Sequence, residues 1–312
     1  MESILSVRGL TKEFKSRPVL KGLDFQIQKG EVLCLLGPNG AGKSTTINIL
    51  SSTLPYDGGE VLYHGQPVRK RLRSYKRKIG MVPQDISLYE ELSPEQNLRF
   101  FSSLYGLSKE RKAEAVEKAL VFAGLEDRRK DAVRTFSGGM KRRLNIACAI
   151  VHDPELVIMD EPTVGIDAQS RNYILQTIND LRERGMTILY TTHYMKEVEA
   201  ISTRVIIIDH GQIIAEGSKE SLIQNYQNKI TYSLETDDTG NLKPDDFDGI
   251  CGVLSSAVSK NQVTFTVQNT GSGIGDILNI LHQKQVGIKK INSSEANLET
   301  VFLDLTGRKL RD

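Results

Sequence analysis

Residues 37–44 read Gly-Pro-Asn-Gly-Ala-Gly-Lys-Ser, and this stretch decides the fold. The apolar run at residues 32–36 directly before it predicts a buried strand, and a helix is expected from about residue 43 to 51. The pattern G-x-x-x-x-G-K-[ST] between a strand and a helix allows backbone N–H groups to curl around an anion, next to the positive end of a helix dipole. This setting argues against the plainer alternative, a glycine-rich turn with an exposed lysine.

The loop predicts that the chain binds a nucleoside triphosphate. Lys43 is placed to meet the β- and γ-phosphates, and the Ser44 hydroxyl is placed to coordinate Mg²⁺. The candidate nucleotide-binding residues of this stretch are Gly37, Pro38, Asn39, Gly40, Ala41, Gly42, Lys43, Ser44 and Thr45.

Two adjacent acids, Asp160 and Glu161, follow the apolar strand expected at residues 156–159. Successive strand residues point to opposite faces, so the two carboxylates should have different neighbours. Asp160 suits the water shell of Mg²⁺, whereas Glu161 is suited to orient or deprotonate the attacking water. Taken alone, the pair fits a solvated strand-to-loop turn equally well. Because Ser44 already predicts a magnesium site, we interpret Asp160 as a metal ligand and Glu161 as the catalytic base.

Residues 136–140, Phe-Ser-Gly-Gly-Met, are followed by three basic residues and lie between the phosphate loop and the Asp160 strand. An isolated Ser-Gly-Gly would be interpreted as a serine helix cap, but such a helix start also presents hydroxyl and N–H donors to an anion. In this position the stretch resembles the signature motif of ABC ATPases, usually written LSGGQ. The resemblance implies that Ser137, Gly138 and Gly139 contact ATP bound to a second subunit, so that two chains hold two nucleotides.

Further residues match the same family in order. Gln84 resembles the loop glutamine that contacts Mg²⁺ and water and senses the permease, and residues 165–167 resemble the loop that touches the partner subunit. His193 resembles the switch histidine at the γ-phosphate, and Phe14 resembles the aromatic residue that stacks on adenine. Each match is weak alone, because a histidine after a strand is often structural and Phe14 fits a core position equally well. Together they extend the resemblance over residues 3–217.

The signature departs from the common form at two positions. Phe136 stands where leucine is usual, and Met140 where glutamine is usual, which puts in doubt any ribose or interdomain contact of that glutamine. The S-G-G-M-[KR]-R-R form resembles the ATPases of ABC-2-type exporters, including daunorubicin-resistance-like drug pumps. The resemblance implies export of a drug, antibiotic or lipid-like compound. An importer ATPase is the alternative, because nothing in the core encodes direction.

The expected fold is α/β. The resemblance implies a P-loop ABC ATPase core in residues 1–225, with a mixed parallel sheet and helices, an antiparallel β subdomain, and a helical subdomain at about residues 85–155. Strands alternating with helices after residue 156 agree with a covered parallel sheet. The pattern changes near residue 225, so we expect a linker at residues 225–229 and a small α+β domain in residues 226–312. Its last helix, at about residues 298–305, is expected to pack on its own sheet, with a dimer-stabilising or regulatory role as the alternative.

The composition is that of an ordinary globular protein. The 41 basic and 39 acidic residues leave a net charge of +2, which argues against a nucleic-acid partner. Cys34, Cys148 and Cys251 lack metal-ligand spacing, and the first two lie in apolar stretches that suit a reducing compartment. We expect no signal peptide and no membrane span.

Any role at a membrane therefore requires partners. The family resemblance implies separate integral-membrane permease subunits, a second ATPase subunit forming a homodimer, and a peripheral location at the cytoplasmic face of the membrane. Apolar residues after Gln84 are interpreted either as the groove that receives the permease or as core of the helical subdomain; they are Leu88, Tyr89, Leu98, Phe100, Phe101 and Leu104.

Two other classes fit less well. A non-transport ABC ATPase acting on DNA would carry a long coiled coil between the phosphate loop and the signature, and no heptads occur there; ribosome-acting relatives carry two ATPase cassettes. A P-loop kinase would not need Ser137. The sequence therefore predicts an ATP hydrolase that uses ATP and Mg²⁺ to power transport.

Overall fold

The computed structural model describes residues 2–224, 229–237, 239, 242–247, 249–268, 273–295 and 297–306. The chain divides into two compact units, residues 1–218 and residues 219–309. Of the linker expected at residues 225–229, positions 225–228 lie outside the described residues.

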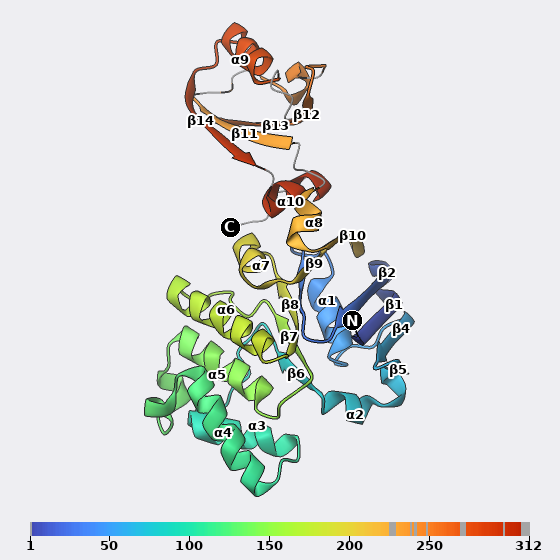
Figure 1. Cartoon of the computed structure of the whole chain (residues 1–312), viewed down its shortest axis with the longest axis vertical. Helices are drawn as coiled ribbons and strands as arrows, with labels where there is room; N and C mark the ends of the chain where they lie inside the picture. The colour runs from blue at the N-terminus through green and yellow to red at the C-terminus, as the bar shows by residue number, and fades with distance from the viewer. Residues whose placement is uncertain are drawn as a thin grey trace. The chain divides into compact units, whose positions relative to one another are not determined.

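A six-stranded sheet forms the centre of the first unit (Figure 1). Its order is β10-β9-β3-β8-β7-β6, and all neighbouring strands run parallel except β10, which is antiparallel to β9. The strands are β3 (Val32–Leu36), β6 (Ile79–Val82), β7 (Leu156–Asp160), β8 (Thr187–Thr192), β9 (Arg204–Asp209) and β10 (Gln212–Gly217). Because β3, β8 and β7 are neighbours, their carboxyl ends bring the phosphate loop, Asp160 and His193 to one edge.

Helices α1 (Lys43–Leu50), α6 (Ala168–Glu183) and α7 (Met195–Ile201) accompany this sheet. Asp167 caps α6 by accepting a hydrogen bond from the Ser170 N–H at 2.8 Å, and Ile174, Ile178 and Leu181 form the buried face of that helix. The α/β core expected from the sequence is confirmed.

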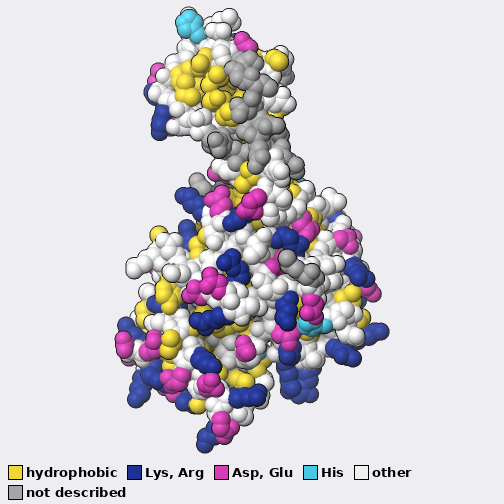
Figure 2. Space-filling view, in the orientation of Figure 1, with side chains coloured by type: hydrophobic (Ala, Val, Ile, Leu, Met, Phe, Trp, Pro, Cys, Tyr) yellow, Lys and Arg dark blue, Asp and Glu magenta, His cyan; other side chains and the backbone are white. Residues whose placement is uncertain are grey.

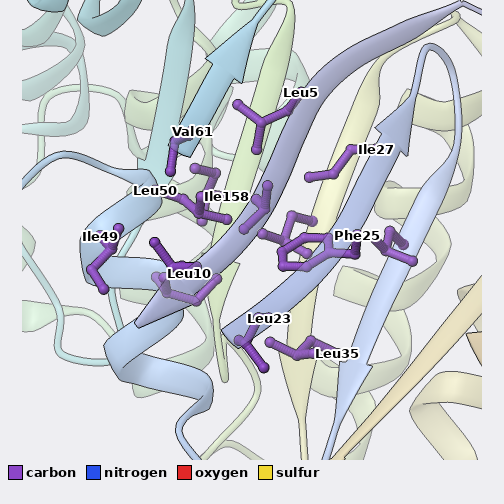
Figure 3. Close-up of a cluster of buried hydrophobic side chains, with 14 of the residues drawn as sticks. Leu5, Leu10, Leu23, Phe25, Ile27, Leu35, Ile49, Leu50, Val61 and Ile158 are labelled. Atoms are coloured by element: carbon purple, nitrogen blue, oxygen red, sulfur yellow. The ribbon is translucent and has the colours of Figure 1, made fainter. Parts of the chain in front are cut away.

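The antiparallel subdomain has the strand order β2-β1-β4-β5. Its elements are β1 (Ser3–Phe14), β2 (Arg17–Gln28), β4 (Gly58–Tyr63), β5 (Gln66–Pro67), the 3₁₀ turn η1 (Val68–Lys70) and α2 (Leu72–Lys76). Apolar side chains of β1, β2 and β4 meet those of α1 and the central sheet in one buried cluster (Figure 3). This cluster fixes the base of the phosphate loop, since both β3 and α1 contribute to it.

The helical subdomain consists of α3 (Pro94–Leu104), α4 (Lys109–Ala123) and α5 (Gly138–Ile150), with the short turns η2 (Glu126–Arg128) and η3 (Val133–Thr135) between α4 and α5. Each of the three helices starts at a serine that caps it, and the cap of α3 is a complete capping box formed by Ser93 and Gln96. A buried apolar cluster joins the three helices.

The second unit contains an antiparallel sheet of order β12-β13-β11-β14. Its elements are α8 (Lys219–Gln224), β11 (Lys229–Thr236), η4 (Pro244–Phe247), β12 (Val253–Ser259), β13 (Gln262–Gln268), α9 (Gly273–Gln283), β14 (Ile288–Glu295) and α10 (Leu298–Thr306). Side chains of β11, β13 and α9 build its core around Phe247 and Phe265. The α+β character expected after residue 226 is present in the described residues.

One expectation about this unit is wrong. Helix α10 packs against α8 rather than on the four-stranded sheet. Leu298, Val301 and Phe302 are buried, but none of them belongs to the core cluster of the sheet. The apolar stripe of α10 identified a buried face, and the sequence did not indicate which element covers it.

No helix in the described part of the chain combines the length and the apolar character required to cross a bilayer.

Candidate functional site

The phosphate loop lies at the turn from β3 into α1. Helix α1 begins at Lys43 after Gly42, which adopts φ 108° and forms no side-chain cap on the helix. A side chain at position 42 would be strained by this φ and would lie 2.7 Å from Leu20 Cδ2. The first backbone N–H groups of α1 are therefore left for an anion instead of a cap.

Lys43 closes the loop from inside. Its Nζ donates to the Gly37 carbonyl at 2.8 Å and to the Pro38 carbonyl at 3.3 Å, and it lies 3.3 Å from Glu161 Oε1. The residue is only 4% exposed. A buried ammonium held by carbonyls and one carboxylate is prepared to bind phosphate oxygens at the same place.

Ser44 and Asp160 meet across the gap between α1 and β7. The Ser44 hydroxyl donates to Asp160 Oδ1 at 3.3 Å, and the Thr191 hydroxyl donates to the same oxygen at 2.7 Å. The described residues contain no group of three or more His, Cys, Asp and Glu side chains able to hold a metal. A pair of protein oxygens fits Mg²⁺, which binds through one or two side chains together with phosphates and water.

Glu161 occupies a strained backbone position, with φ 44°. For a residue other than glycine this conformation costs on the order of 1–3 kcal/mol. It is held there because the Glu161 N–H donates to both the carbonyl and the hydroxyl of Thr191, at 3.2 and 3.0 Å. The turn directs the Glu161 carboxylate toward Lys43 and away from the partners of Asp160. The two acids thus have the different neighbours that strand alternation predicts.

His193 follows β8 and faces the same carboxylate. Its Nδ1 lies 3.1 Å from Glu161 Oε2 without forming a hydrogen bond. Its ring packs against the Tyr194 ring at a centroid distance of 4.2 Å. Glu161 therefore stands between Lys43 and His193, one on each carboxylate oxygen.

Gln84 and Phe14 stand apart from this group. Gln84 is exposed after β6, and Phe14 is 44% exposed at the end of β1, with Lys12 Nζ 5.4 Å from its ring centroid. Among the described residues, no hydrogen bond or ion pair joins either side chain to Lys43 or Glu161. Their predicted contacts with Mg²⁺ and adenine stay predictions.

The two glycines of the signature turn have different surroundings. Ser137 caps α5 by accepting from the Met140 N–H at 3.3 Å, and Ser137 and Gly138 are both exposed. A Cβ at Gly138 would meet nothing within 4 Å, whereas a Cβ at Gly139 would lie 2.0 Å from Ser170 Oγ. Gly139 is thus required by packing on α6, whereas no contact with the described residues requires a glycine at position 138.

Arg142 is a functional candidate that the sequence analysis did not separate from its basic neighbours. It is buried on α5 and donates to the carbonyls of Pro83 and Gln84. Burial lowers the pKa of its guanidinium. Arg142 therefore ties the signature helix to the loop that carries Gln84, and only the folded structure distinguishes it from Lys141 and Arg143.

Glu197 is a second candidate that sequence reasoning missed. This carboxylate, 1% exposed on α7, accepts from the hydroxyls of Thr163, Tyr190 and Thr192 at 2.5, 2.9 and 2.7 Å. Burial, with a further contribution from Glu197, raises the pKa of Tyr190, so the phenol stays protonated and donates. The Thr192 hydroxyl also accepts from the Tyr194 N–H at 2.9 Å, which fixes the turn on both sides of His193. A glutamate four residues after a histidine gives no sign of this burial.

Comparison with known proteins agrees with this geometry. A family model described as "ABC transporter" matches residues 20–164. The linearmycin resistance ATP-binding protein LnrL of Bacillus subtilis is 40% identical, over 99% of this chain and 100% of that protein. The Nod factor export ATP-binding protein I of Cupriavidus metallidurans is 37% identical, over 100% of both chains. Both similarities include the C-terminal unit.

Solved structures match the larger part of the chain. The ATP-binding subunit of an ABC transporter superposes with a TM-score of 0.66 at 30% identity, covering 72% of this chain and 93% of that one. The protein cbiO1 of Clostridium perfringens, part of the ABC transporter complex cbiONQ, gives a TM-score of 0.67 at 28% identity, covering 72% and 92%.

Proposed function

This chain belongs to the ATP-binding proteins of ABC transporters, and we propose that two copies of it close around two ATP molecules to drive export through separate membrane-spanning permease subunits. The chain is an ATP-binding ATPase of this family. The proposal concerns which residues do the work, how the chains associate and what they power.

The position of Glu161 carries the proposal. Its two carboxylate oxygens lie 3.3 Å from Lys43 Nζ and 3.1 Å from His193 Nδ1. We assign Glu161 as the base that orients and deprotonates the attacking water, Lys43 as the cation at the β- and γ-phosphates, and His193 as the switch at the γ-phosphate. Phe14 stacks on the adenine.

Ser44 and Asp160 would hold Mg²⁺, and Gln84 would contribute a further contact. When bound, this ion neutralises charge on the phosphate oxygens. Without it, Ser44 and Asp160 keep each other in place by their hydrogen bond, and Thr191 orients the carboxylate.

The exposed signature turn supports the dimer. In the described part of the chain, no hydrogen bond or ion pair connects Ser137 or Gly138 to Lys43, Asp160 or Glu161. Donors placed at a helix start and open to solvent suit the γ-phosphate of a nucleotide held by another copy. ATP then favours the closed dimer, because only that state supplies these donors.

Export is supported by the two full-length relatives, one named for linearmycin resistance and the other for Nod factor export. We infer a cargo of the drug, antibiotic or lipid-like class and a position on the cytoplasmic face of the membrane. Exposed aromatic side chains after Gln84 offer a surface for the permease: Tyr89 and Phe100 contact each other edge to face, and Leu104 is exposed beside them. Leu98, on the same helix, is buried and belongs to the subdomain core.

The variant Glu161→Gln tests the assignment. It keeps the shape of the side chain but cannot accept a proton, so we expect ATP binding to persist, turnover to fall about 10²–10⁴-fold, and an ATP-dependent dimer to accumulate. Phosphate release, nucleotide titration and size-exclusion chromatography measure the three effects.

The matched control is Glu155→Gln. Glu155 is hydrogen-bonded to Tyr63 and paired with Lys78, before β7 rather than after it. Its replacement should leave turnover within about twofold of the unchanged chain, as for a surface charge pair. Ordinary turnover by Glu161→Gln would remove Glu161 from the role of base.

A further inference from the structure

Residues 69–78 carry the most concentrated positive charge in the chain. They read Arg-Lys-Arg-Leu-Arg-Ser-Tyr-Lys-Arg-Lys, with seven basic residues and no acidic one. The chain as a whole has a net charge of +2, so the remainder of the sequence is net acidic. Such asymmetry indicates a local anionic partner rather than a general property of the surface.

The stretch is a firmly anchored part of the antiparallel subdomain. It covers the end of η1 and the whole of α2, between β5 and β6. Tyr75 is buried, donates its hydroxyl to the Leu50 carbonyl at 2.7 Å and packs edge-on against Tyr63. All seven basic residues are exposed, and Figure 2 shows Lys and Arg side chains gathered over α2.

Most of these cations lack an acidic partner. Arg69 stacks on Tyr56, and Lys78 pairs with Glu155 at 2.7 Å. The other five form no ion pair with any residue that the structure describes. We call these five the α2 basic patch: Lys70, Arg71, Arg73, Lys76 and Arg77.

The chemistry of the patch favours a lipid surface. Leu72, 42% exposed, lies among the cations and is the kind of side chain that enters the headgroup region. Unpaired Lys and Arg side chains on a short helix match the disperse negative charge of anionic phospholipids. Single-stranded nucleic acid also requires exposed aromatic side chains for its bases, and the one aromatic residue of the stretch, Tyr75, is buried.

We propose that the α2 basic patch binds anionic phospholipid headgroups, so that the ATPase contacts the membrane surface directly. This contact goes beyond the proposed function, because it requires neither a permease nor ATP. It adds a second attachment to the one supplied by the permease, and the two attachments together restrict how the subunit is oriented.

Vesicle sedimentation with the purified full chain tests the proposal. The unchanged chain should bind vesicles of phosphatidylcholine with phosphatidylglycerol, should bind vesicles of phosphatidylcholine alone much more weakly, and should dissociate as salt is raised. Each cation near an anionic surface changes the partition about fivefold, so the triple variant Lys70→Gln, Arg73→Gln, Lys76→Gln should bind about 100-fold more weakly.

The control removes the same charges elsewhere. Lys109, Arg111 and Lys130 are exposed in the helical subdomain and form no ion pair among the described residues. Their replacement by glutamine subtracts two lysines and one arginine, as the test variant does, and should weaken vesicle binding by less than about fivefold. Basal ATP hydrolysis and thermal unfolding should be unchanged in both triples, which separates this result from any failure of the proposed function.

Three outcomes would overturn the proposal. The first is equal loss of binding in the two triples, which would reduce the effect to net charge. The second is binding that ignores phosphatidylglycerol. The third is binding of the unchanged chain to polyglutamate or single-stranded DNA but not to anionic vesicles, which would assign the patch to an acidic protein or to nucleic acid.

Discussion

Two helix starts of this chain use the same backbone chemistry in opposite ways. Helix α1 begins after Gly42 with no side-chain cap, and its first two residues contact other parts of the same chain: Lys43 is buried, and Ser44 donates to Asp160. Helix α5 begins after Ser137, whose side chain caps it; Ser137 and Gly138 are exposed, whereas Gly139 is buried. We propose that both present N–H groups to an anion.

The difference indicates which part of the proposed site is complete within one chain and which part requires a second chain. At α1 the lysine and the serine already contact two acids, at the end of β7 and in the turn after it, within one chain. At α5 a Cβ on Gly139 would meet Ser170, whereas a Cβ on Gly138 would meet no described atom within 4 Å. We propose that the first helix start forms a complete phosphate site within one chain, and that the second supplies donors to a nucleotide held by another chain.

The largest expected effect comes from Lys43→Ala, which changes the proposed phosphate site at the start of α1. The variant removes the cation from the phosphates and leaves Glu161 without its charged neighbour, so ATP affinity and turnover should each fall about 10²–10³-fold. Titration with a fluorescent ATP analogue and phosphate release measure the loss.

Lys78→Ala is the control for this variant, because Lys78 also pairs with a glutamate, at 2.7 Å, on the far side of β7. It should leave nucleotide affinity unchanged. If Lys43→Ala bound ATP as well as the unchanged chain, the phosphate loop would lose its assignment.

A pair of glycine variants addresses the second helix start. The added methyl group of Gly138→Ala meets no described atom within 4 Å, so the variant should unfold at the temperature of the unchanged chain. It should nevertheless lose about 10–100-fold of its activity, because the methyl group would enter the closed dimer. Gly139→Ala collides with Ser170 and should instead lower the free energy of unfolding by about 1–3 kcal/mol. Thermal unfolding and phosphate release, measured side by side, distinguish the two.

Full ATPase activity of Gly138→Ala, together with ATP-dependent dimer formation, would contradict this difference between the two helix starts. In that case nothing would approach Gly138 in the working state, and the exposed turn would be a simple helix cap. The same pair in the Glu161→Gln background reports dimer formation without turnover.

The sequence predicts those parts of the fold that depend on neighbours along the chain. The caps at Ser93, Ser108 and Ser137 and the buried run of β3 are local patterns, and the structure confirms them. The sequence pattern does not indicate strand β12, because this half-exposed edge strand contains three serines and lacks the apolar alternation of β13. The partner of α10 also depends on packing that no local pattern contains.

The site residues also divide into those that local motifs predict and those that only packing identifies. Lys43, Ser44, Asp160 and Glu161 belong to motifs with a physical reason for each residue, and the structure brings them together. Arg142 and Glu197 act through residues distant in the sequence, Arg142 on the loop of Gln84 and Glu197 on Thr163. Burial decides their role, and burial of a charged side chain is the property that a single sequence reveals least.

The smallest expected effect comes from Glu197→Gln, which tests whether the phosphate site at α1 depends on the buried hydrogen bonds of Glu197. A glutamine can accept only part of the three hydroxyl hydrogen bonds and places an N–H group against the others, so the turn that carries His193 should loosen. We expect turnover to fall about tenfold with little change in ATP affinity, since a loss near 1.4 kcal/mol in positioning corresponds to tenfold in rate.

A double variant separates positioning from general damage. If Glu197 acts through His193, then Glu197→Gln should cause no further loss of turnover in a chain that already carries His193→Ala. Glu199→Gln, at an exposed position of the same helix, should leave turnover unchanged in both backgrounds. Losses that multiply in the double variant would show that Glu197 only stabilises the fold, and the support of the phosphate edge would then rest on Thr191 and the strained turn at Glu161 alone.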